Sequence, residues 1–600
     1  MIFVCGSLGA KPCAATRASA ERMTTARRVA RTRDVQLLQH GAIAVASAAC
    51  QVEVASAGSV SVLLFRPAWQ AARAGQTELE ALARGFAADG ALDATRLDGP
   101  FVLLAHDSAA RRAALANDRF GICPVHVRDD RGTLNFATDL SALVAAGDTP
   151  PALDAQAIYD YVFFHCIPAP RTIYRGVSKL GPATCLNWQD GSFSSATYWH
   201  PEFAPPGDSV PDGADLLAAL ERAVDAQAAD ACGAFLSGGL DSSSVAGMLK
   251  RARGEAATFT IGFDADGYDE SAFARRVAEH FATNHHEHYV TPGDVCDALP
   301  LIAGHYGEPF GNSSVIPAYY CARFARDHGV GLMLAGDGGD ELFAGNTRYT
   351  DQNVFETWFR VPAALRATLK AAYRALPVLE GLPLAGKGAR YIQQAEMGLP
   401  DRLQSYNFLN RFDPAKVFAQ DWLDQVDTNA PWAAWRERYA AADAPSALQR
   451  MLYLDWKFTL ADNDLVKVSN MCELAGVEVT YPMLANGVVD LSCRLPAETL
   501  LEGGELRGFY KNSVRDFLPA ATIEKSKHGF GLPFGVWMQH DAGLRSMAAE
   551  ALDQVATRGI LRADFVREAR RLHEQGTAGY YGELVWILVM LEMWLQAHGH

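Results

Sequence analysis

The sequence lacks the features that would place it in several large classes of protein. No apolar run reaches the length of a membrane span; the most apolar one, Val585–Leu595, contains Glu592 and predicts a buried terminal helix. Lys and Arg number 54 against 69 Asp and Glu, and the net charge of -15 argues against a general nucleic-acid binder. The locally basic stretch from Arg17 to Arg33 has the composition of a transit peptide, but we interpret it as an exposed helical face.

Paired cysteines, sequence repeats and low-complexity segments are also missing. The eleven cysteines are scattered, without CxxC spacing and without a secretory signal, so we expect reduced thiols in a cytoplasmic protein. What is present is a chain of 600 residues with 49% hydrophobic and 20% charged residues. These values predict a globular protein of more than one domain.

The order of predicted elements suggests two domains, 1–205 and 206–600. The first is rich in strand candidates: Val60–Phe65, Phe101–Ala105 and Val125–Val127. Pro205–Asp208 is the best linker signal. From Gly213 onward short apolar strands alternate with longer helical segments, among them a helix around Ser271–Phe281, and beyond about Tyr349 the pattern is mainly helical. The second domain is therefore expected to be α/β with a mostly parallel sheet.

The stretch from Ala231 to Arg251 carries the clearest chemical signal. A buried strand (Ala234–Leu236) is followed by Ser237-Gly238-Gly239, by Asp241 with three serines, and then by a helical run from Val245 to Lys250. This layout points backbone N–H groups at an anion on a helix N-terminus. Asp241 would repel a bare phosphate, so its presence indicates a bridging Mg²⁺. An ordinary Gly/Ser turn before a helix is the alternative, and no Walker A lysine follows.

A second strand-to-glycine turn occurs at Leu332–Asp340. It supplies two carboxylates, Asp337 and Asp340, three residues apart. A Mg-ATP site needs a second carboxylate opposite Asp241 to hold the metal on the phosphates. This turn is therefore a candidate for the other half of one site.

These motifs resemble a known family over nearly the whole chain. Ser237–Ser243 resembles the SGGxDS pyrophosphate loop of the N-type ATP pyrophosphatases, and together with Gly336–Phe343 it is similar to the signatures of asparagine synthetase-type proteins. Asp98–Phe101, Asn117–Gly121, Phe136–Asp139 and Pro168–Tyr174 resemble the glutaminase-type domain of that family. The resemblance implies an α/β fold: an N-terminal Ntn-hydrolase-like αββα sandwich, then an adenosine-nucleotide α-hydrolase (ATP pyrophosphatase) parallel-sheet domain with a helical C-terminal part.

The resemblance also implies ATP and Mg²⁺ as cofactors and a set of site residues. The metal ligands would be Asp241 and Asp340. The nucleotide would be bound by Leu236, Ser237, Gly238, Gly239, Asp241, Ser242, Ser243, Ile261, Ala335 and Gly336, with Leu236 and Ile261 at the base and Ala335-Gly336 along the nucleotide.

Two further residues are assigned catalytic roles. Lys527, just before the family-like x-Gly-Phe-Gly, would stabilise charge on the α-phosphate as pyrophosphate leaves. Asp337 would orient or deprotonate an incoming amine, although it could be only a turn-forming aspartate. Lys525 is expected outside the site, on a charged surface turn, and Lys467 could serve the site or merely form an ion pair.

The family's glutaminase depends on a cysteine at residue one, whose own amine serves as base. Here Cys5-Gly6 follows four residues, and an internal cysteine has an amide nitrogen that cannot accept a proton. The family's Asn-Gly-Glu is replaced by Leu64–Trp69, while Asp98, which in the family binds the glutamine amine, is retained. We therefore expect an inactive glutaminase-like domain, unless processing exposes Cys5.

The predicted reaction is ATP-dependent amide formation through an acyl-adenylate, with AMP and pyrophosphate released. The favoured hypothesis is macrolactam ring closure of a lasso peptide, with a peptide or small-molecule carboxylate as substrate and a leader peptidase as partner. An asparagine synthetase-like amidotransferase using glutamine or ammonia is the alternative. A β-lactam synthetase-like enzyme is disfavoured by Asp337, where those enzymes carry Tyr, and a non-catalytic homologue by the retained Asp241, Asp340 and Lys527. No membrane or nucleic-acid partner is expected.

The histidines of Asn284–His288 invite a metal-site interpretation. Adjacent histidines on a strand face opposite sides and do not converge on one ion. A metal site is therefore not expected there.

Overall fold

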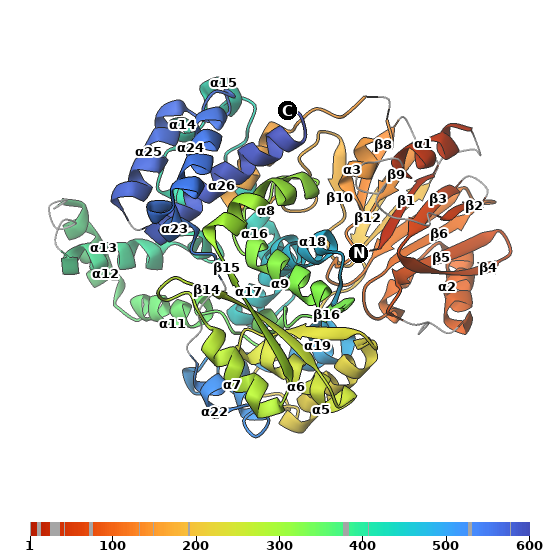
Figure 1. Cartoon of the computed structure of the whole chain (residues 1–600), viewed down its shortest axis with the longest axis horizontal. Helices are drawn as coiled ribbons and strands as arrows, with labels where there is room; N and C mark the ends of the chain where they lie inside the picture. Colours follow the sequence, from red (N-terminus) through yellow and green to blue (C-terminus); the bar gives the residue numbers. More distant parts are fainter. Residues whose placement is uncertain are drawn as a thin grey trace.

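The structure is a computed structural model that describes residues 2–8, 14–24, 36–40, 43–70, 76–130, 133–147, 149–189, 192–375, 383–405, 407–525, 531–576 and 578–600. In Figure 1 two antiparallel sheets lie at the right, a parallel sheet with its helices lies at the bottom centre, and the C-terminal helices lie at the upper left. Lys527 falls outside the described residues.

The N-terminal part is a sandwich of two antiparallel sheets. Their strand orders are β10-β8-β9-β1-β3-β2 and β12-β11-β7-β6-β5-β4. The first sheet contains β1 (Phe3–Leu8), β2 (Gln36–His40), β3 (Ile43–Ala48), β8 (His126–Asp130), β9 (Thr133–Ala137) and β10 (Val177–Lys179). The second contains β4 (Cys50–Ala57), β5 (Val60–Pro67), β6 (Val102–Asp107), β7 (Arg112–Asn117), β11 (Thr184–Gln189) and β12 (Ser192–Thr197).

Alternation along the strands makes both faces of these sheets apolar. Val4, Phe65 and Leu104 belong to one buried core shared by the two sheets. Leu64 and Leu103, the neighbours of these residues, point the opposite way and pack on α2 (Gln76–Asp89). Helices α1 (Ala14–Thr24) and α3 (Leu140–Val144) pack against the first sheet. The layers are therefore helix, sheet, sheet, helix, and the expected Ntn-hydrolase-like sandwich is confirmed.

The second part is built on a parallel sheet with the strand order β15-β14-β13-β16-β17. Its strands are β13 (Cys232–Phe235), β14 (Ala257–Phe263), β15 (Asn284–Val290), β16 (Leu332–Leu334) and β17 (Glu478–Thr480), and every pair runs parallel. Helix α6 (Leu240–Arg253) packs on β13 and α5 (Gly213–Gln227), α7 (Ser271–Phe281) packs on β14, and α9 (Val315–Asp327) lies against β14 and α18 (Leu465–Ala475). Because β13 and β16 are parallel neighbours, the loops that follow them meet at one edge of the sheet.

Several sequence predictions are confirmed element by element. The strands predicted at Val60–Phe65 and Phe101–Ala105 are β5 and β6, and the expected parallel sheet is present. One boundary was wrong: α6 begins at Leu240, so Asp241 and the serines after it form the first helical turn instead of a loop. Ser243 and Ser244 are both 0% exposed. The helix therefore starts early, with these residues packed inward.

Beyond Tyr349 the described residues are mainly helical, as expected. Besides α18 and a π-helix at Trp456–Asp464, they form α11 (Arg348–Phe359), α12 (Ala363–Ala375), α13 (Pro383–Glu396), α14 (Pro414–Val417), α15 (Gln420–Leu423), α16 (Ala430–Ala440), α17 (Ala447–Asp455), α19 (Asn486–Cys493), α20 (Ala497–Leu500), α21 (Gly508–Ser513), α22 (Ala520–Glu524), α23 (Phe534–His540), α24 (Ala542–Val555), α25 (Ala563–Gln575) and α26 (Ala578–Ala597).

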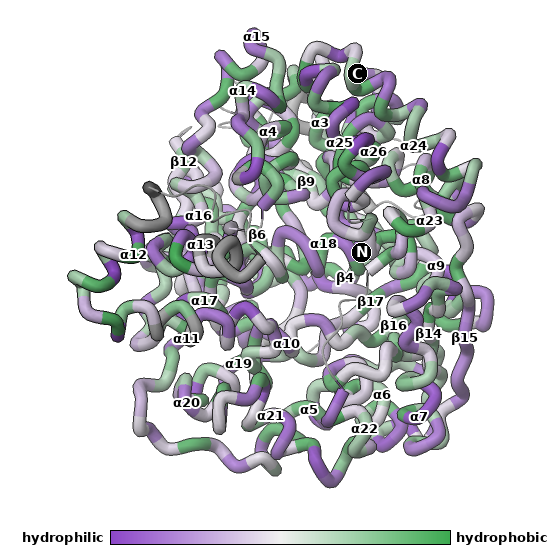
Figure 2. The backbone as a smooth tube through the Cα atoms, turned by 90° about the vertical axis from the view of Figure 1, so that its left-hand side faces the viewer, coloured by the Kyte–Doolittle hydropathy of each residue, from purple (hydrophilic) through white to green (hydrophobic). Residues whose placement is uncertain are grey.

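The most apolar stretch, Val585–Leu595, lies within α26. It packs among α8 (Pro292–His305), α23, α24 and α25, whose tubes surround it in Figure 2. Its one carboxylate, Glu592, is fully buried and paired with Arg558. No helix among the described residues combines the length and apolar character that crossing a membrane requires.

The two parts are joined by polar contacts. Arg119 pairs with Asp490 at 3.0 Å, the Lys457 ammonium donates to the Pro182 carbonyl at 3.1 Å, and the Tyr161 hydroxyl donates to the Ile587 carbonyl at 2.8 Å. The connection around Pro205–Asp208 has no helix or strand. The exact boundary between 1–205 and 206–600 stays a prediction.

Candidate active site

The first loop of the site joins β13 to α6. Gly238 has φ +70° and packs so closely on Phe273 that a Cβ would lie 2.5 Å from its carbonyl carbon. The side chains of Ser237 and Ser242 close the loop on itself: their hydroxyl oxygens lie 3.0 Å apart, and Ser242 Oγ accepts from the Ser237 N–H at 3.2 Å. Since Gly239, the residue before α6, has no side chain to cap it, the backbone N–H groups at this helix N-terminus stay available to an anion.

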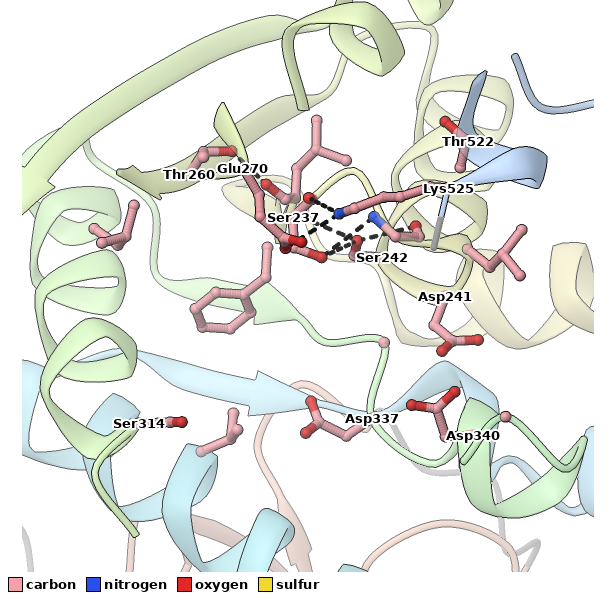
Figure 3. A pocket seen from close by; sticks show the side chains of 18 of the residues that line it. Ser237, Asp241, Ser242, Thr260, Glu270, Ser314, Asp337, Asp340, Thr522 and Lys525 are labelled. Carbon is pink, nitrogen blue, oxygen red and sulfur yellow. Dashed lines mark hydrogen bonds and ion pairs between the residues drawn. The ribbon is translucent and has the colours of Figure 1, made fainter. Parts of the chain in front are cut away.

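The second loop joins β16 to the short helix α10 (Gly339–Leu342). Gly338 takes φ +101° to make the turn. Gly336 abuts the first loop: a Cβ there would lie 2.7 Å from the Ser242 nitrogen. The two loops therefore pack closely at the edge of the sheet. Figure 3 shows Asp241, in the first turn of α6, facing Asp340 of α10.

Asp241 and Asp340 meet at one cation. Arg507 Nη1 donates to Asp241 Oδ2 at 2.8 Å and to Asp340 Oδ1 at 3.2 Å, and Nη2 also contacts Asp241. Two glycines at and after α10 leave space for the carboxylates. A Cβ on Gly339 would lie 1.9 Å from Asp241 Oδ1, and one on Gly345 would lie 1.9 Å from Asp340 Oδ1. The two carboxylates thus share one cation, the Arg507 guanidinium, in a space that a side chain at Gly339 or Gly345 would fill. This arrangement of carboxylate oxygens fits a divalent metal such as Mg²⁺.

Asp337 lies on the same turn and faces the same cavity (Figure 3). Burial raises the pKa of its carboxyl to about 6, although nearby Lys467 opposes this. Lys467 forms an ion pair with Asp464 at 2.7 Å and also lines the cavity. The two positions considered for this lysine, in the site and in an ion pair, therefore do not exclude each other.

Lys525 is a correction to the sequence analysis. Its side chain is only 8% exposed, and its ammonium donates to the Ser237 carbonyl at 3.2 Å and pairs with Glu270 at 3.1 Å. The expectation of a surface turn was wrong because α22 (Ala520–Glu524) packs against α6 and α7 and carries the next residue inward. The predicted Lys527 lies in 526–530, outside the described residues, so its placement stays a prediction.

A cavity of about 590 Å³ connects these groups. Among the predicted residues its walls include Leu236, Ser237, Gly239, Asp241, Ser242, Ile261, Gly336, Asp337 and Asp340. Three predicted residues are not on the wall: Gly238 turns against Phe273, Ala335 is buried at 1% exposure, and the Ser243 hydroxyl is buried without a hydrogen-bond partner among the described residues.

Sequence reasoning missed Arg507, Glu270 and Lys511, which also line the cavity. Arg507 directly precedes α21 and Lys511 lies within it, and nothing in the local sequence pointed these residues at Asp241. Glu270 directly precedes the predicted helix Ser271–Phe281, and this N-terminal position was the available signal.

Two histidines of β15 contact residues of the neighbouring strand β14. His285 contacts the Thr258 hydroxyl at 3.0 Å, whereas its neighbour His286 stacks on Phe259. The two side chains thus have separate surroundings. Among the residues that the structure describes, no group of three potential metal ligands comes together.

Cys5 lies in the middle of β1, between β3 and β9. It is 0% exposed, and burial raises the pKa of its thiol to about 12. Asp98 accepts from the backbone nitrogens of Gly99 at 2.8 Å and Asn486 at 3.1 Å, so its carboxylate connects the two parts of the chain. Neither arrangement is that of an activated nucleophile with an open amine-binding carboxylate.

The chain matches two family descriptions. Residues 215–596 match "Asparagine synthase", and residues 68–199 match "Glutamine amidotransferase domain". The first match covers more than half of the chain and contains both loops of the site.

Individual relatives carry the same family name. The chain is 23% identical over 518 residues to asparagine synthetase [glutamine-hydrolyzing] 1 of Bacillus subtilis, covering 84% of this chain and 78% of that protein. It is 27% identical over 472 residues to a putative asparagine synthetase [glutamine-hydrolyzing] of Mycobacterium bovis, covering 77% and 71%. A solved structure, the allosteric regulatory enzyme of purine biosynthesis, aligns over 48% of this chain and 80% of its own with a TM-score of 0.23 and 10% identity. From the two family matches, the first of which spans both loops of the site, the chain belongs to the asparagine synthase family.

Proposed function

We propose that this protein is an ATP-dependent amide synthetase. It adenylates a carboxyl group, releases pyrophosphate, and passes the acyl group to ammonia or another amine with release of AMP. The observation that carries the proposal is the convergence of Asp241 and Asp340, from the loops after two parallel strands, on a single cation beside the Ser237–Gly239 turn.

In this proposal the first loop holds the phosphates of ATP. The backbone of Ser237, Gly238 and Gly239, the first turn of α6 and the Ser242 hydroxyl offer the hydrogen-bond donors. Ser243 supports the turn from the buried side. The base would lie against Leu236 and Ile261, and the rest of the nucleotide along Ala335 and Gly336.

Asp241 and Asp340 would hold Mg²⁺ on the phosphates. When bound, the metal neutralises charge that builds on the phosphate oxygens during adenylation. The residues themselves contribute placement: Gly339 and Gly345 leave the two carboxylates room to approach one another.

Lys525 is the described cation best placed to stabilise the departing pyrophosphate. Its ammonium reaches the carbonyl of Ser237 on the phosphate loop, and Glu270 fixes its direction. The sequence pattern favours Lys527 for this role, and the two lysines are separable by mutation.

Asp337 would act on the incoming amine. A carboxyl with its pKa raised to about 6 is still ionised at neutral pH and is a stronger base than an ordinary aspartate. Its position between the metal-binding carboxylates and Lys467 suits a group that accepts a proton as the amide forms.

The nitrogen donor is proposed to be free ammonia. The Cys5 thiol is buried within a strand and its raised pKa keeps it protonated, so glutamine hydrolysis by this domain is not supported. The two relatives described above are named asparagine synthetases, which favours the amidotransferase hypothesis over macrolactam ring closure. Aspartate is accordingly the first carboxylate to test.

The test is AMP release measured by chromatography with ATP, Mg²⁺ and aspartate, supplied either with ammonium or with glutamine. We expect AMP and asparagine with ammonium and none with glutamine alone. Equal rates with glutamine would show a working glutaminase. ADP in place of AMP would contradict adenylation, and AMP only with a leader-cleaved peptide would restore the ring-closure hypothesis.

A further inference from the structure

Arg507 has an unusual backbone conformation. It directly precedes α21 with φ +62° and ψ +32°, a left-handed conformation that residues with a Cβ rarely adopt. The next residue, Gly508, has no room for a side chain, because a Cβ there would lie 2.7 Å from the Cβ of Glu502. Surrounding contacts must therefore hold Arg507 in this conformation, which is a common sign of a functional position.

The side chain is buried at the centre of the candidate metal site. It is 6% exposed, and its guanidinium lies over the Tyr510 ring at 4.5 Å. Burial lowers the pKa of Arg507, but the carboxylates of Asp241 and Asp340 outweigh it and raise the pKa above its ordinary value. A permanent positive charge thus lies where two like-charged groups would otherwise repel one another.

The contacts of Arg507 use the same oxygens that a metal would need. Nη1 binds one oxygen of each carboxylate, and Nη2 takes the second oxygen of Asp241. Mg²⁺ makes short, near-octahedral bonds to oxygen, so an ion held by both carboxylates would need the space between them that Nη1 now occupies, and its charge would repel the guanidinium. The arginine and the metal are therefore alternative occupants of one position.

We propose that Arg507 is a positioning residue that exchanges with Mg²⁺: it bridges Asp241 and Asp340 before the nucleotide binds, gives up both carboxylates when Mg-ATP arrives, and then pairs with the pyrophosphate oxygens. This inference rests on the proposed function, since it names the regulation of that same site. The arginine keeps the empty site assembled and makes metal binding depend on the nucleotide, whose phosphates offer the displaced guanidinium a new partner.

The chemistry of exchange predicts opposite effects on two measurements. Without Arg507 the two carboxylates are open to metal, so Mg²⁺ alone should bind more tightly. Binding of Mg-ATP, in contrast, should lose the guanidinium–phosphate contact and weaken. If Arg507 had only a structural role, its removal would not strengthen the binding of Mg²⁺.

The experiment titrates Mg²⁺ alone into the nucleotide-free full chain by calorimetry, for wild type and Arg507→Met. We expect the apparent Kd for Mg²⁺ to fall about tenfold in Arg507→Met, a coupling of ordinary size for two competing occupants. Adding Asp340→Asn to that variant should abolish the gain. Arg515→Met is the matched control, because Arg515 is an exposed arginine whose guanidinium binds Asn512 and does not line the cavity.

If Arg507→Met does not fold, Arg507→Lys replaces it. A lysine keeps the charge but presents one compact ammonium that cannot bridge both carboxylates in the same geometry, so a smaller gain in Mg²⁺ affinity is expected. Unchanged or weaker Mg²⁺ binding in a folded variant would overturn the exchange. Because the titration contains no nucleotide, its outcome is separate from turnover: absence of AMP formation by wild type would sink the proposed function, while the titration would still decide whether Arg507 and Mg²⁺ compete.

Discussion

Asp241 and Asp340, which follow different strands, accept hydrogen bonds from one and the same nitrogen, Arg507 Nη1, at 2.8 and 3.2 Å. The parallel pairing of β13 with β16 is what brings the two loops together. Under the proposed function this arrangement is a site for a cation beside a phosphate-binding loop, and most of the predictions below are derived from it.

Removing either carboxylate should abolish adenylation without unfolding the protein. Asp241→Asn and Asp340→Asn each leave a polar side chain of the same size but halve the negative charge available to the metal. We expect ATP–pyrophosphate exchange to fall about 10²–10³-fold in each. Circular dichroism and the melting temperature control for folding, and an exchange rate within a factor of two of wild type would contradict the assignment.

Gly339→Ala tests the cradle around Asp241. The added Cβ would lie 1.9 Å from Asp241 Oδ1, and because the φ of Gly339 is accessible to alanine, the clash is the main effect. We expect loss of Mg-ATP binding in a folded protein. Gly331→Ala is the control, since a Cβ at Gly331 meets nothing within 4 Å. Equal binding by the two variants would show that Asp241 can move away freely.

Lys525→Met should slow adenylation about 10²-fold, because the ammonium beside the Ser237 carbonyl is lost where charge develops on the leaving group. Lys525→Arg should retain part of the rate. Lys416→Met, at an exposed lysine outside the cavity, serves as control. If Lys527→Met alone removes the rate while Lys525→Met is harmless, the sequence-based choice of Lys527 is right and the role assigned to Lys525 is wrong.

The raised pKa of Asp337 should make the rate of amide formation depend on pH. Its pKa of about 6 means that the base is lost as pH falls below 6, so the rate of transfer to ammonia should drop between pH 7 and pH 5. At a constant concentration of free NH3, Asp337→Asn should remove this dependence and lower the transfer rate about 10²-fold, while ATP–pyrophosphate exchange continues. A parallel loss of exchange would place Asp337 in adenylation instead.

The raised pKa of Asp337 should affect the stability of the fold in the opposite direction to the reaction rate. The folded-state pKa lies above the ordinary 3.8, so between these values the folded protein holds a proton that the unfolded chain has released. Folding is therefore favoured at low pH, and this contribution is lost as pH rises through 6. Asp337→Asn should raise the free energy of unfolding by about 1–2 kcal/mol at pH 8, discounted for partial exposure, and change it little at pH 4. Denaturant unfolding at the two pH values measures the difference.

Cys5→Ala should leave ammonia-dependent activity unchanged. The thiol is buried in β1 and far from a state that could attack glutamine, because its pKa is raised to about 12. Glutaminase assays on wild type should give no glutamate above the rate of the variant. Glutamate release that disappears in Cys5→Ala would show that the strand opens and that the domain is active.

Much of this arrangement follows from local sequence. Helix α7 has the predicted bounds Ser271–Phe281, since its apolar spacing is strongly periodic. The two glycine loops were identifiable because each combines a buried strand, a positive-φ glycine and an aspartate. Their meeting followed from the rule that parallel strands end at one edge of a sheet.

Other parts could not be predicted, and the reason is the same for each. Arg507 reaches Asp241 across a separation of 266 residues, and Lys525 reaches Ser237 across 288. Such contacts depend on how helices far along the chain pack on the sheet, which no local pattern encodes. Lys525 was expected on the surface because its neighbours are charged, but the packing of α22 decides its direction.

The central claim is that the site forms an acyl-adenylate. The most direct measurement supplies the amide-forming carboxylate labelled with ¹⁸O in both carboxyl oxygens and follows the label by mass spectrometry of the nucleotide product. Adenylation predicts that one ¹⁸O atom appears in AMP and none in pyrophosphate. Label in inorganic phosphate, with ADP as the nucleotide, would mean phosphorylation of the substrate instead and would contradict the account.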